Sequence, residues 1–369
     1  MAKQAWDAAE IAEMGMGLLA WYGRSRRDLP WRHSTEPYAI WVSEIMLQQT
    51  RVAVVADRYQ EFMKRFPTLI ALALAPEQDV LALWSGLGYY RRARMLHKAA
   101  EFVASHLGGN LPTRAEELRA LPGIGAYTAA AVASIAHGEP VAVVDGNVER
   151  VLCRLAGWEA GSRKGGGAAL RHKIEDLAGR LLDRARPGDF NQAIMELGAT
   201  VCLPRNPQCL VCPLAIDCKT RGEHKTPPRA PMISRAVGYA LSVRTESEEG
   251  RQRGPGGREV LLEQRSAQQT VMPGMWELPA LIQAEVPQKE LRMTLRHAIM
   301  QVNYYVHVRT VFEDDIESMT VAGGERRWVS LREAAGMALT GLARKVLTRA
   351  HLFPTSPLDN IALTGKDAR

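Results

Sequence analysis

Apolar residues recur every three or four positions up to about residue 222, which is the spacing of one face of an α-helix. Prolines stand near the starts of several of these stretches, where a helix tolerates them best. The pattern predicts a mostly helical region, with helices over Ile11–Leu19, Ile40–Leu47, Val52–Phe62, Val80–Leu83, Leu96–Val103 and Ala126–Ile135.

The period changes after residues 224–231, whose sequence His-Lys-Thr-Pro-Pro-Arg-Ala-Pro is typical of a linker. Beyond it apolar residues alternate, as in half-buried strands. A polar, glycine-rich loop is expected at 246–258. We predict strands over Val237–Val243, Glu259–Gln264 and Val302–Phe312, then helices over Leu331–Ala338 and Leu342–Leu352.

These patterns predict two domains of different class. Residues 1–222 form an all-α domain, 223–235 a linker, 236–352 a smaller α+β domain and 353–369 a loose tail. No apolar run is long enough to span a membrane and no secretory signal is visible, so we expect a cytoplasmic protein without membrane contact. We also expect a monomer, associated with the nucleoid if the source is bacterial.

The chain is basic, with a net charge of +7 and a pI of about 9.2. A polyanionic partner such as nucleic acid agrees with this charge, although the charge alone does not establish it. Both halves share the basic excess, so composition does not say which half binds it.

Four of the 5 cysteines lie within one short segment, with the spacing C-x6-C-x2-C-x5-C. A chain with 46% hydrophobic residues does not need a disulfide framework, so the segment predicts a metal site. The gaps match neither zinc-finger nor ferredoxin spacings, and they leave zinc and an iron–sulfur cluster open. The fifth, Cys153, lies in an apolar helical run and is expected to be a small buried residue. The predicted ligands are Cys202, Cys209, Cys212 and Cys218.

A second motif is the sharp turn Pro122-Gly123-Ile124-Gly125 before an alanine-rich helix. The glycines allow positive φ and close approach of the backbone, and free N–H groups at the following helix start can bind an anion. A plain helical hairpin is the alternative. Shortly downstream, Asp145 follows an apolar run and precedes a helix, where it is either a helix N-cap, a catalytic carboxylate, or both.

The cysteine loop resembles that of the endonuclease III superfamily of DNA repair glycosylases, and the turn resembles their helix-hairpin-helix. Further motifs resemble the adenine DNA glycosylases (MutY type) within that superfamily, and the resemblance covers residues 5–222. They are Leu29-Pro30-Trp31-Arg32, the Ser43–Thr50 segment Ser-Glu-Ile-Met-Leu-Gln-Gln-Thr, the segment Trp84–Arg94 and the segment Phe190–Gly198.

This resemblance implies roles for individual residues. Glu44 would protonate the leaving adenine and Asp145 would stabilise the cationic sugar, while Tyr127 and Asn147 would position Asp145, the sugar or the water. Bifunctional relatives carry a lysine where this chain has Tyr127, and a phenol cannot form a Schiff base with the sugar. The resemblance therefore implies a monofunctional enzyme that uses water, and a [4Fe–4S] cluster held by the four cysteines.

Cleavage also requires adenine to leave the base stack. By the same resemblance, Gln49 and Tyr89 would insert into the duplex, and Arg27, Trp31 and Glu196 would line the adenine pocket. Gly123 and Gly125 would bind phosphate. The basic run with Arg91, Arg92, Arg94 and Lys98 is expected to face phosphates as well.

Residues 236–352 resemble the Nudix-like C-terminal domain of adenine glycosylases, best at Arg265–Pro279. No glutamate-rich metal-binding run follows Pro279, so no pyrophosphatase activity is expected. The resemblance implies that this domain reads the base opposite adenine. The usual Phe-Ser-His tip is replaced by Ile299-Met300-Gln301, which leaves the preference for 8-oxoguanine over guanine open.

We therefore expect excision of adenine from double-stranded DNA with A:8-oxoguanine or A:G mispairs. A thymine- or uracil-mismatch glycosylase on the same scaffold is one alternative. A non-catalytic iron–sulfur DNA-binding protein is the other.

Overall fold

A computed structural model describes residues 6–159, 167–224, 231–245, 257–299, 301–321 and 323–353. The chain divides into two compact units, Met1–Leu74 with Met95–Pro228, and Ala75–Arg94 with Arg229–Arg369. The boundary at 228 lies within the predicted linker. Residues 75–94, however, group with the C-terminal region, whereas the sequence predicted them to be part of the N-terminal all-α domain. Residues 225–230 of the linker, 246–256 of the glycine-rich loop and the tail from 354 lie outside the described residues.

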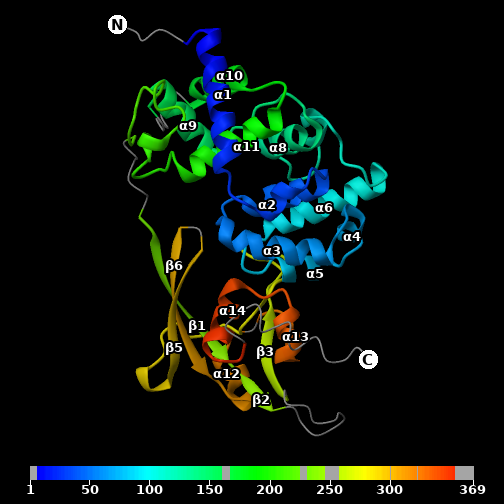
Figure 1. Ribbon diagram of the computed structural model, residues 1–369. Coiled ribbons are helices and arrows are strands. Elements are labelled where there is room, and N and C mark those ends of the chain that lie inside the picture. Colours follow the sequence, from blue (N-terminus) through cyan, green and yellow to red (C-terminus); the bar gives the residue numbers. More distant parts are fainter. Residues whose placement is uncertain are drawn as a thin grey trace. The chain divides into compact units, whose positions relative to one another are not determined.

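The first unit is helical, and every helix predicted for it is present (Figure 1). Helix α6 starts in the second unit and continues into the first. The elements are α1 (Ala8–Ser25), η1 (Pro30–His33), α2 (Pro37–Leu47), α3 (Val52–Arg65), α4 (Leu69–Ala73), α6 (Arg91–His106), α7 (Ala115–Leu118), α8 (Ala126–His137), α9 (Gly146–Ala156), α10 (Gly167–Leu181), α11 (Pro187–Thr200) and η2 (Cys209–Val211).

Local signals set the helix ends. Asp7 caps α1 in a capping box with Glu10, and a left-handed Gly138 (φ 67°) ends α8. The helix before the Pro-Gly turn is a single turn, α7. Leu121 lies beyond its end but is buried like Leu118.

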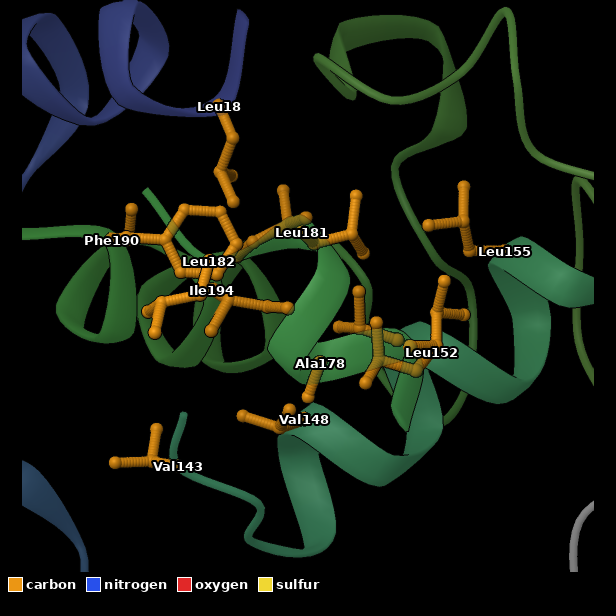
Figure 2. Packing of buried hydrophobic residues seen from close by; sticks show 14 of the residues in the cluster. Leu18, Val143, Val148, Leu152, Leu155, Ala178, Leu181, Leu182, Phe190 and Ile194 are labelled. Atoms are coloured by element: carbon orange, nitrogen blue, oxygen red, sulfur yellow. The ribbon is translucent and has the colours of Figure 1, made fainter. Parts of the chain in front are cut away.

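One hydrophobic cluster joins α1, α8, α9, α10 and α11 (Figure 2). Leu18, Leu152, Phe190 and Ile194 are almost fully buried in it, as is Cys153, as predicted. Truncating a buried aromatic such as Phe190 to alanine costs about 3–5 kcal/mol. This packing fixes α9 and α11, the two helices that carry Asn147 and Glu196.

The second unit combines α5 (Glu77–Leu83) with two sheets. In one, β1 (Ile233–Leu241) runs parallel to β6 (Val302–Thr310), which pairs antiparallel with β5 (Leu291–Ile299). In the other, β3 (Arg258–Gln264) pairs antiparallel with β2 (Val243–Thr245), β4 (Trp276–Glu277) and β7 (Arg326–Ser330). The remaining elements are η3 (Gln288–Glu290), η4 (Glu313–Asp315), α12 (Ile316–Met319), α13 (Leu331–Gly336) and α14 (Gly341–Arg349).

Two strand predictions need correction. The predicted strand Val237–Val243 is broken at the buried Ser242, and its two parts enter different sheets. Strand β5 was not predicted, although Leu291, Met293 and Leu295 alternate with polar residues as in a half-buried strand; it pairs with β6 with one irregularity between Leu291 and Met293. Tertiary pairing, rather than local pattern, sets the break at Ser242. Among the described residues, no helix is both long and apolar enough to cross a bilayer.

Candidate active site

A cavity of about 1390 Å³ opens in the first unit, lined by side chains from α2, α8, α9 and α11. It brings together every site residue predicted from this unit apart from the cysteines. Those lining residues are Arg27, Trp31, Glu44, Gln49, Gly123, Gly125, Tyr127, Asp145, Asn147 and Glu196.

Glu44 lies in α2, a helix whose residues from Tyr38 to Met46 are all buried, and is itself only 5% exposed. Tyr127 Oη donates a 2.6 Å hydrogen bond to Glu44 Oε2 and lies 3.1 Å from Met195 Sδ. Burial raises the pKa of Glu44 most, and the charge of Asp145 raises it as well. The hydrogen bond from Tyr127 and the charge of Arg32 lower it, and the resulting pKa is about 7. Glu44 is therefore a carboxyl group that can hold a proton near neutral pH. Burial also raises the pKa of Tyr127 well above its ordinary value, so its hydroxyl stays a donor.

Asp145 is both the N-cap of α9 and a cavity residue, as the sequence allowed. Its Oδ1 accepts bonds from the backbone N–H groups of Asn147 and Val148, and its Oδ2 accepts one from Asn147 Nδ2 at 3.0 Å. Three N–H donors hold one carboxylate in a single orientation.

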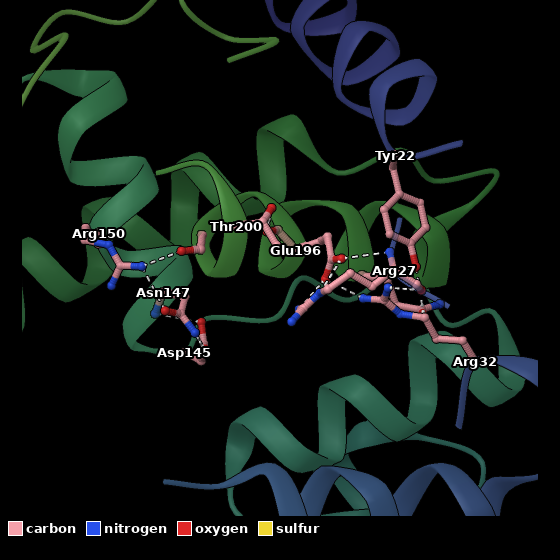
Figure 3. Close-up of polar contacts among 10 residues, drawn as sticks. Tyr22, Arg27, Arg32, Asp145, Asn147, Arg150, Glu196 and Thr200 are labelled. Carbon is pink, nitrogen blue, oxygen red and sulfur yellow. Dashed lines mark hydrogen bonds and ion pairs between the residues drawn. The ribbon is translucent and has the colours of Figure 1, made fainter. Parts of the chain in front are cut away.

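Further contacts fix Asn147 and the strand-like segment before Asp145. Arg150 Nη2 donates to Asn147 Oδ1 at 2.9 Å and to the carbonyl of Gly198 (Figure 3). A side chain at Gly198 would place its Cβ 2.7 Å from Asn147 Cβ, so α9 and α11 require glycine there. The fully buried Asn191 bonds the backbone of Val141 and Val143 through its amide.

Glu196 lies on α11 with its side chain 1% exposed. Arg27 donates to it through backbone N, Nε and Nη2, and Arg32 through Nη2 at 2.7 Å (Figure 3). Burial opposes ionisation, but these bonds outweigh it and lower the pKa of Glu196 to about 2. Glu196 is therefore a fixed carboxylate between two cations.

Of the two glycines in the predicted phosphate-binding turn, only Gly123 has the expected positive φ and close approach, since Gly125 has φ −86°. Gly123 is left-handed (φ 74°), and a Cβ there would lie 2.5 Å from Met95 Cβ, so only glycine fits. A Cβ at Gly125 would meet nothing within 4 Å, and α8 starts there without a side-chain cap. Its first N–H groups therefore remain available to an anion.

The two predicted inserting residues are both exposed and left-handed. Gln49 has φ 57° at the end of α2 in the first unit. Tyr89, in the second unit, has φ 48° and is 49% exposed. Such conformations cost on the order of 1 kcal/mol each for residues with side chains, and proteins keep them at functional turns.

The basic run behaves differently from its prediction. Arg94 pairs with Glu77 at 3.0 Å, and Arg92 Nη2 donates to the carbonyls of Leu87 and Gly88. Arg91 and Lys98 are exposed. Within the described residues, two of the four predicted phosphate ligands are thus engaged inside the protein.

The four clustered cysteines line one small cavity with Arg154. Arg154 is 3% exposed, and its Nη1 lies 3.4 Å from Cys202 Sγ. Within the described part of the chain, no three Cys, His, Asp or Glu side chains are gathered so that they could hold a metal ion.

Sequence reasoning missed Arg32, Arg150 and Arg154 as site residues. Arg32 stood in a quoted motif, and Arg150 and Arg154 lie three and seven residues after Asn147, on the same face of a helix. That spacing was the available signal. Most of their partners, among them Glu196, Gly198 and Leu203, lie far along the chain, and no sequence pattern specifies them.

Comparison with known proteins gives the family. Residues 42–173 match the HhH-GPD superfamily base excision DNA repair proteins. The chain is 49% identical over 224 residues to the adenine DNA glycosylase of Homo sapiens, covering 58% of this chain and 40% of the human protein. It is 35% identical over 407 residues to that of Mus musculus, covering 92% of this chain and 78% of the mouse protein.

Solved structures agree in fold. A thermostable thymine-DNA glycosylase is 28% identical with a TM-score of 0.51, covering 58% of this chain and 99% of that one. A non-covalent endonuclease III–DNA complex is 22% identical with a TM-score of 0.50, covering 59% and 97%. The matches to the human and rat proteins span only 40% and 42% of their lengths. With four fifths of the mouse relative covered, the chain belongs to the adenine DNA glycosylase family of the HhH-GPD superfamily.

Proposed function

We propose that this protein excises adenine mispaired with 8-oxoguanine or guanine in double-stranded DNA, as a monofunctional glycosylase. The observation that carries the proposal is the buried Glu44, with a pKa of about 7, in one cavity with Asp145. A carboxylic acid and a carboxylate on one cavity match the needs of glycosidic cleavage.

Glu44 supplies the proton. Adenine leaves poorly as an anion, so N7 must be protonated as the bond between C1′ and N9 breaks. An acid with a pKa near the working pH is well suited to this transfer, and the enclosed site strengthens its effect. Tyr127 orients the carboxyl group through its 2.6 Å bond.

Asp145 stabilises the sugar. Positive charge develops on the ring as the base departs, and a rigid carboxylate lowers the energy of that state. Asn147 holds Asp145, and Arg150 holds Asn147. The cavity has a tyrosine, not a lysine, at position 127, so water completes the reaction and the DNA strand is not cut.

DNA contacts divide between the units. Gln49 and Tyr89 each insert into the duplex. The Gly123–Gly125 turn and Arg205, an exposed residue of the cysteine loop, bind phosphate, and Arg27, Trp31 and Glu196 line the adenine pocket. The second unit is Nudix-like and reads the opposing base through the β5–β6 hairpin. Ile299 and Gln301 lie at this hairpin, while Met300 lies outside the described residues.

We also propose that the four cysteines hold a [4Fe–4S] cluster. Four thiols around a common cavity supply the ligand set that such a cluster needs, and the buried Arg154 places a cation beside them. Arg154 Nε is buried without a hydrogen-bond partner. The cluster's role is to brace the loop that carries Arg205. Iron and sulfide analysis with a visible spectrum tests this; a colourless zinc protein would refute it.

The deciding experiment is single-turnover excision from duplexes with A:8-oxoguanine, A:G and T:G. We expect the two adenine substrates to react and T:G to be inert. Faster release of thymine would favour the thymine-mismatch alternative, which the solved thymine-DNA glycosylase keeps open. Tight binding without release of any base would favour a non-catalytic protein.

A further inference from the structure

The turn at residues 84–90, here called the Tyr89 loop, is held in an unusual conformation. Three of its residues are left-handed: Gly86 (φ 97°), Gly88 (φ 68°) and Tyr89 (φ 48°). Trp84 Nε1 and Arg92 Nη2 both donate to the carbonyl of Gly88, and the Arg92 guanidinium lies 5.6 Å from the Tyr89 ring centre. The loop is therefore shaped so that an exposed ring projects from it.

C-terminal residues bind both ends of this loop. Arg344 Nε, on α14, donates a 2.8 Å hydrogen bond to Ser85 Oγ, and Ser85 is 1% exposed. Tyr90 Oη donates to the carbonyl of Leu339 just before α14, at 3.2 Å. Arg94 Nη2 donates to the carbonyl of Pro273. These contacts all lie inside the second unit and join residues that are 179 to 259 positions apart in sequence.

The residue that follows Arg344 on α14 binds strand β5. Lys345 Nζ donates a 2.8 Å bond to the carbonyl of Arg296 on β5, three residues before Ile299. Adjacent residues of one helix thus hold the Tyr89 loop and the hairpin strand.

From this geometry we propose that α14 positions Tyr89. Arg344, through Ser85, fixes the loop that presents the ring, and Lys345 fixes β5, so one helix sets the spacing between the inserting ring and the hairpin. Arg344 and Ser85 are positioning residues that act on base extrusion and not on proton transfer. This inference rests on the proposed function, in which Tyr89 enters the duplex.

A double-mutant cycle tests it. Ser85→Ala, Arg344→Met and Tyr89→Ala are measured singly and as the pairs S85A/Y89A and R344M/Y89A. The readouts are single-turnover excision of A opposite 8-oxoguanine and the fluorescence of 2-aminopurine placed at the target position. Arg349→Met, an exposed arginine on the same helix, is the matched control.

We expect S85A and R344M each to slow excision about 10-fold, because misplacing a group near the reacting atoms lowers the rate by up to about 100-fold. Both should reduce the 2-aminopurine signal. In the double variants, neither substitution should slow excision beyond the rate of Y89A alone. R349M should match the wild type. On a duplex with an abasic site opposite adenine, where extrusion is easier, the loss should shrink.

Additive effects with Y89A, or an unchanged 2-aminopurine signal, would overturn the inference. If S85A unfolds, R344M and Tyr90→Phe carry the same test, with urea unfolding as the check on folding. A wild-type protein that releases no adenine would refute the proposed function instead, so the two failures are distinguishable.

Discussion

Two glutamates line the same cavity, both almost fully buried, and their acidities differ widely. The pKa of Glu44 is raised to about 7 and that of Glu196 is lowered to about 2. Burial opposes ionisation of both. The difference is the partners, since Glu44 receives one phenol hydrogen bond, whereas Glu196 receives four N–H bonds from two arginines.

This contrast separates the two tasks of the site. A group that donates a proton must lie away from cations, because a nearby cation favours its ionised form. A carboxylate that stays ionised, such as Glu196, is instead stabilised by hydrogen bonds from cations. Arg32 bears on both, because it lowers the pKa of each carboxyl group but bonds only Glu196. Direct contact, rather than proximity, decides which group stays protonated.

The largest effect is expected for Glu44→Gln. The amide keeps the shape and can accept from Tyr127, but it has no proton to give, so excision should fall about 10²- to 10⁴-fold. Stability should stay level or rise, because no charge remains to be buried. Single-turnover rates and urea unfolding check this. Activity within a few fold of wild type would exclude Glu44 as the acid.

Glu196→Gln should show the opposite balance. It leaves Arg32 buried without its carboxylate, so the free energy of unfolding should fall by about 3 kcal/mol; solvent around the partly exposed Arg27 limits the loss. The ion pair stabilises the folded state fully above pH 4.5, the ordinary pKa of Glu196. Its contribution is lost as the pH falls toward 2, because folding lowers the pKa of Glu196 to about 2. Urea unfolding at pH 7 and at pH 3 measures both, and equal losses at the two pH values would contradict the charge account.

The pH profile of excision sharpens the comparison further. Glu44 must be protonated to act, so the single-turnover rate should be constant below its pKa of about 7 and fall tenfold per pH unit above it. Glu196 is already ionised throughout this range and should add no limb. A profile that is flat from pH 6 to 9 would remove Glu44 from the acid role.

Tyr127→Phe should have the smallest effect. The phenol stabilises the ionised carboxylate, so its loss should raise the pKa of Glu44 and move the falling limb to higher pH. Loss of one hydrogen bond should lower stability by about 1 kcal/mol. A limb that moves to lower pH would show that Tyr127 instead favours the protonated form.

Much of the site could be predicted because it rests on local signals. The glycines of the turn at 122–125, the cap at Asp145 and the thiol spacing can be recognised along the chain; the glycines and Asp145 line one cavity of the first unit and the four thiols line another. The break at Ser242 was missed, because pairing across a sheet decides where a strand ends, and β5 was missed although its residues alternate.

The sequence by itself determined the helical periodicity, the cluster of thiols and the carboxylic acids Glu44, Asp145 and Glu196 as candidates for the site. Only the tertiary structure showed why the pKa values of Glu44 and Glu196 differ, and that residues 75–94 pack with the C-terminal unit. Acidity depends on burial and on donors more than 100 residues away, such as those joining Arg27 to Glu196, and chain order does not encode such distances.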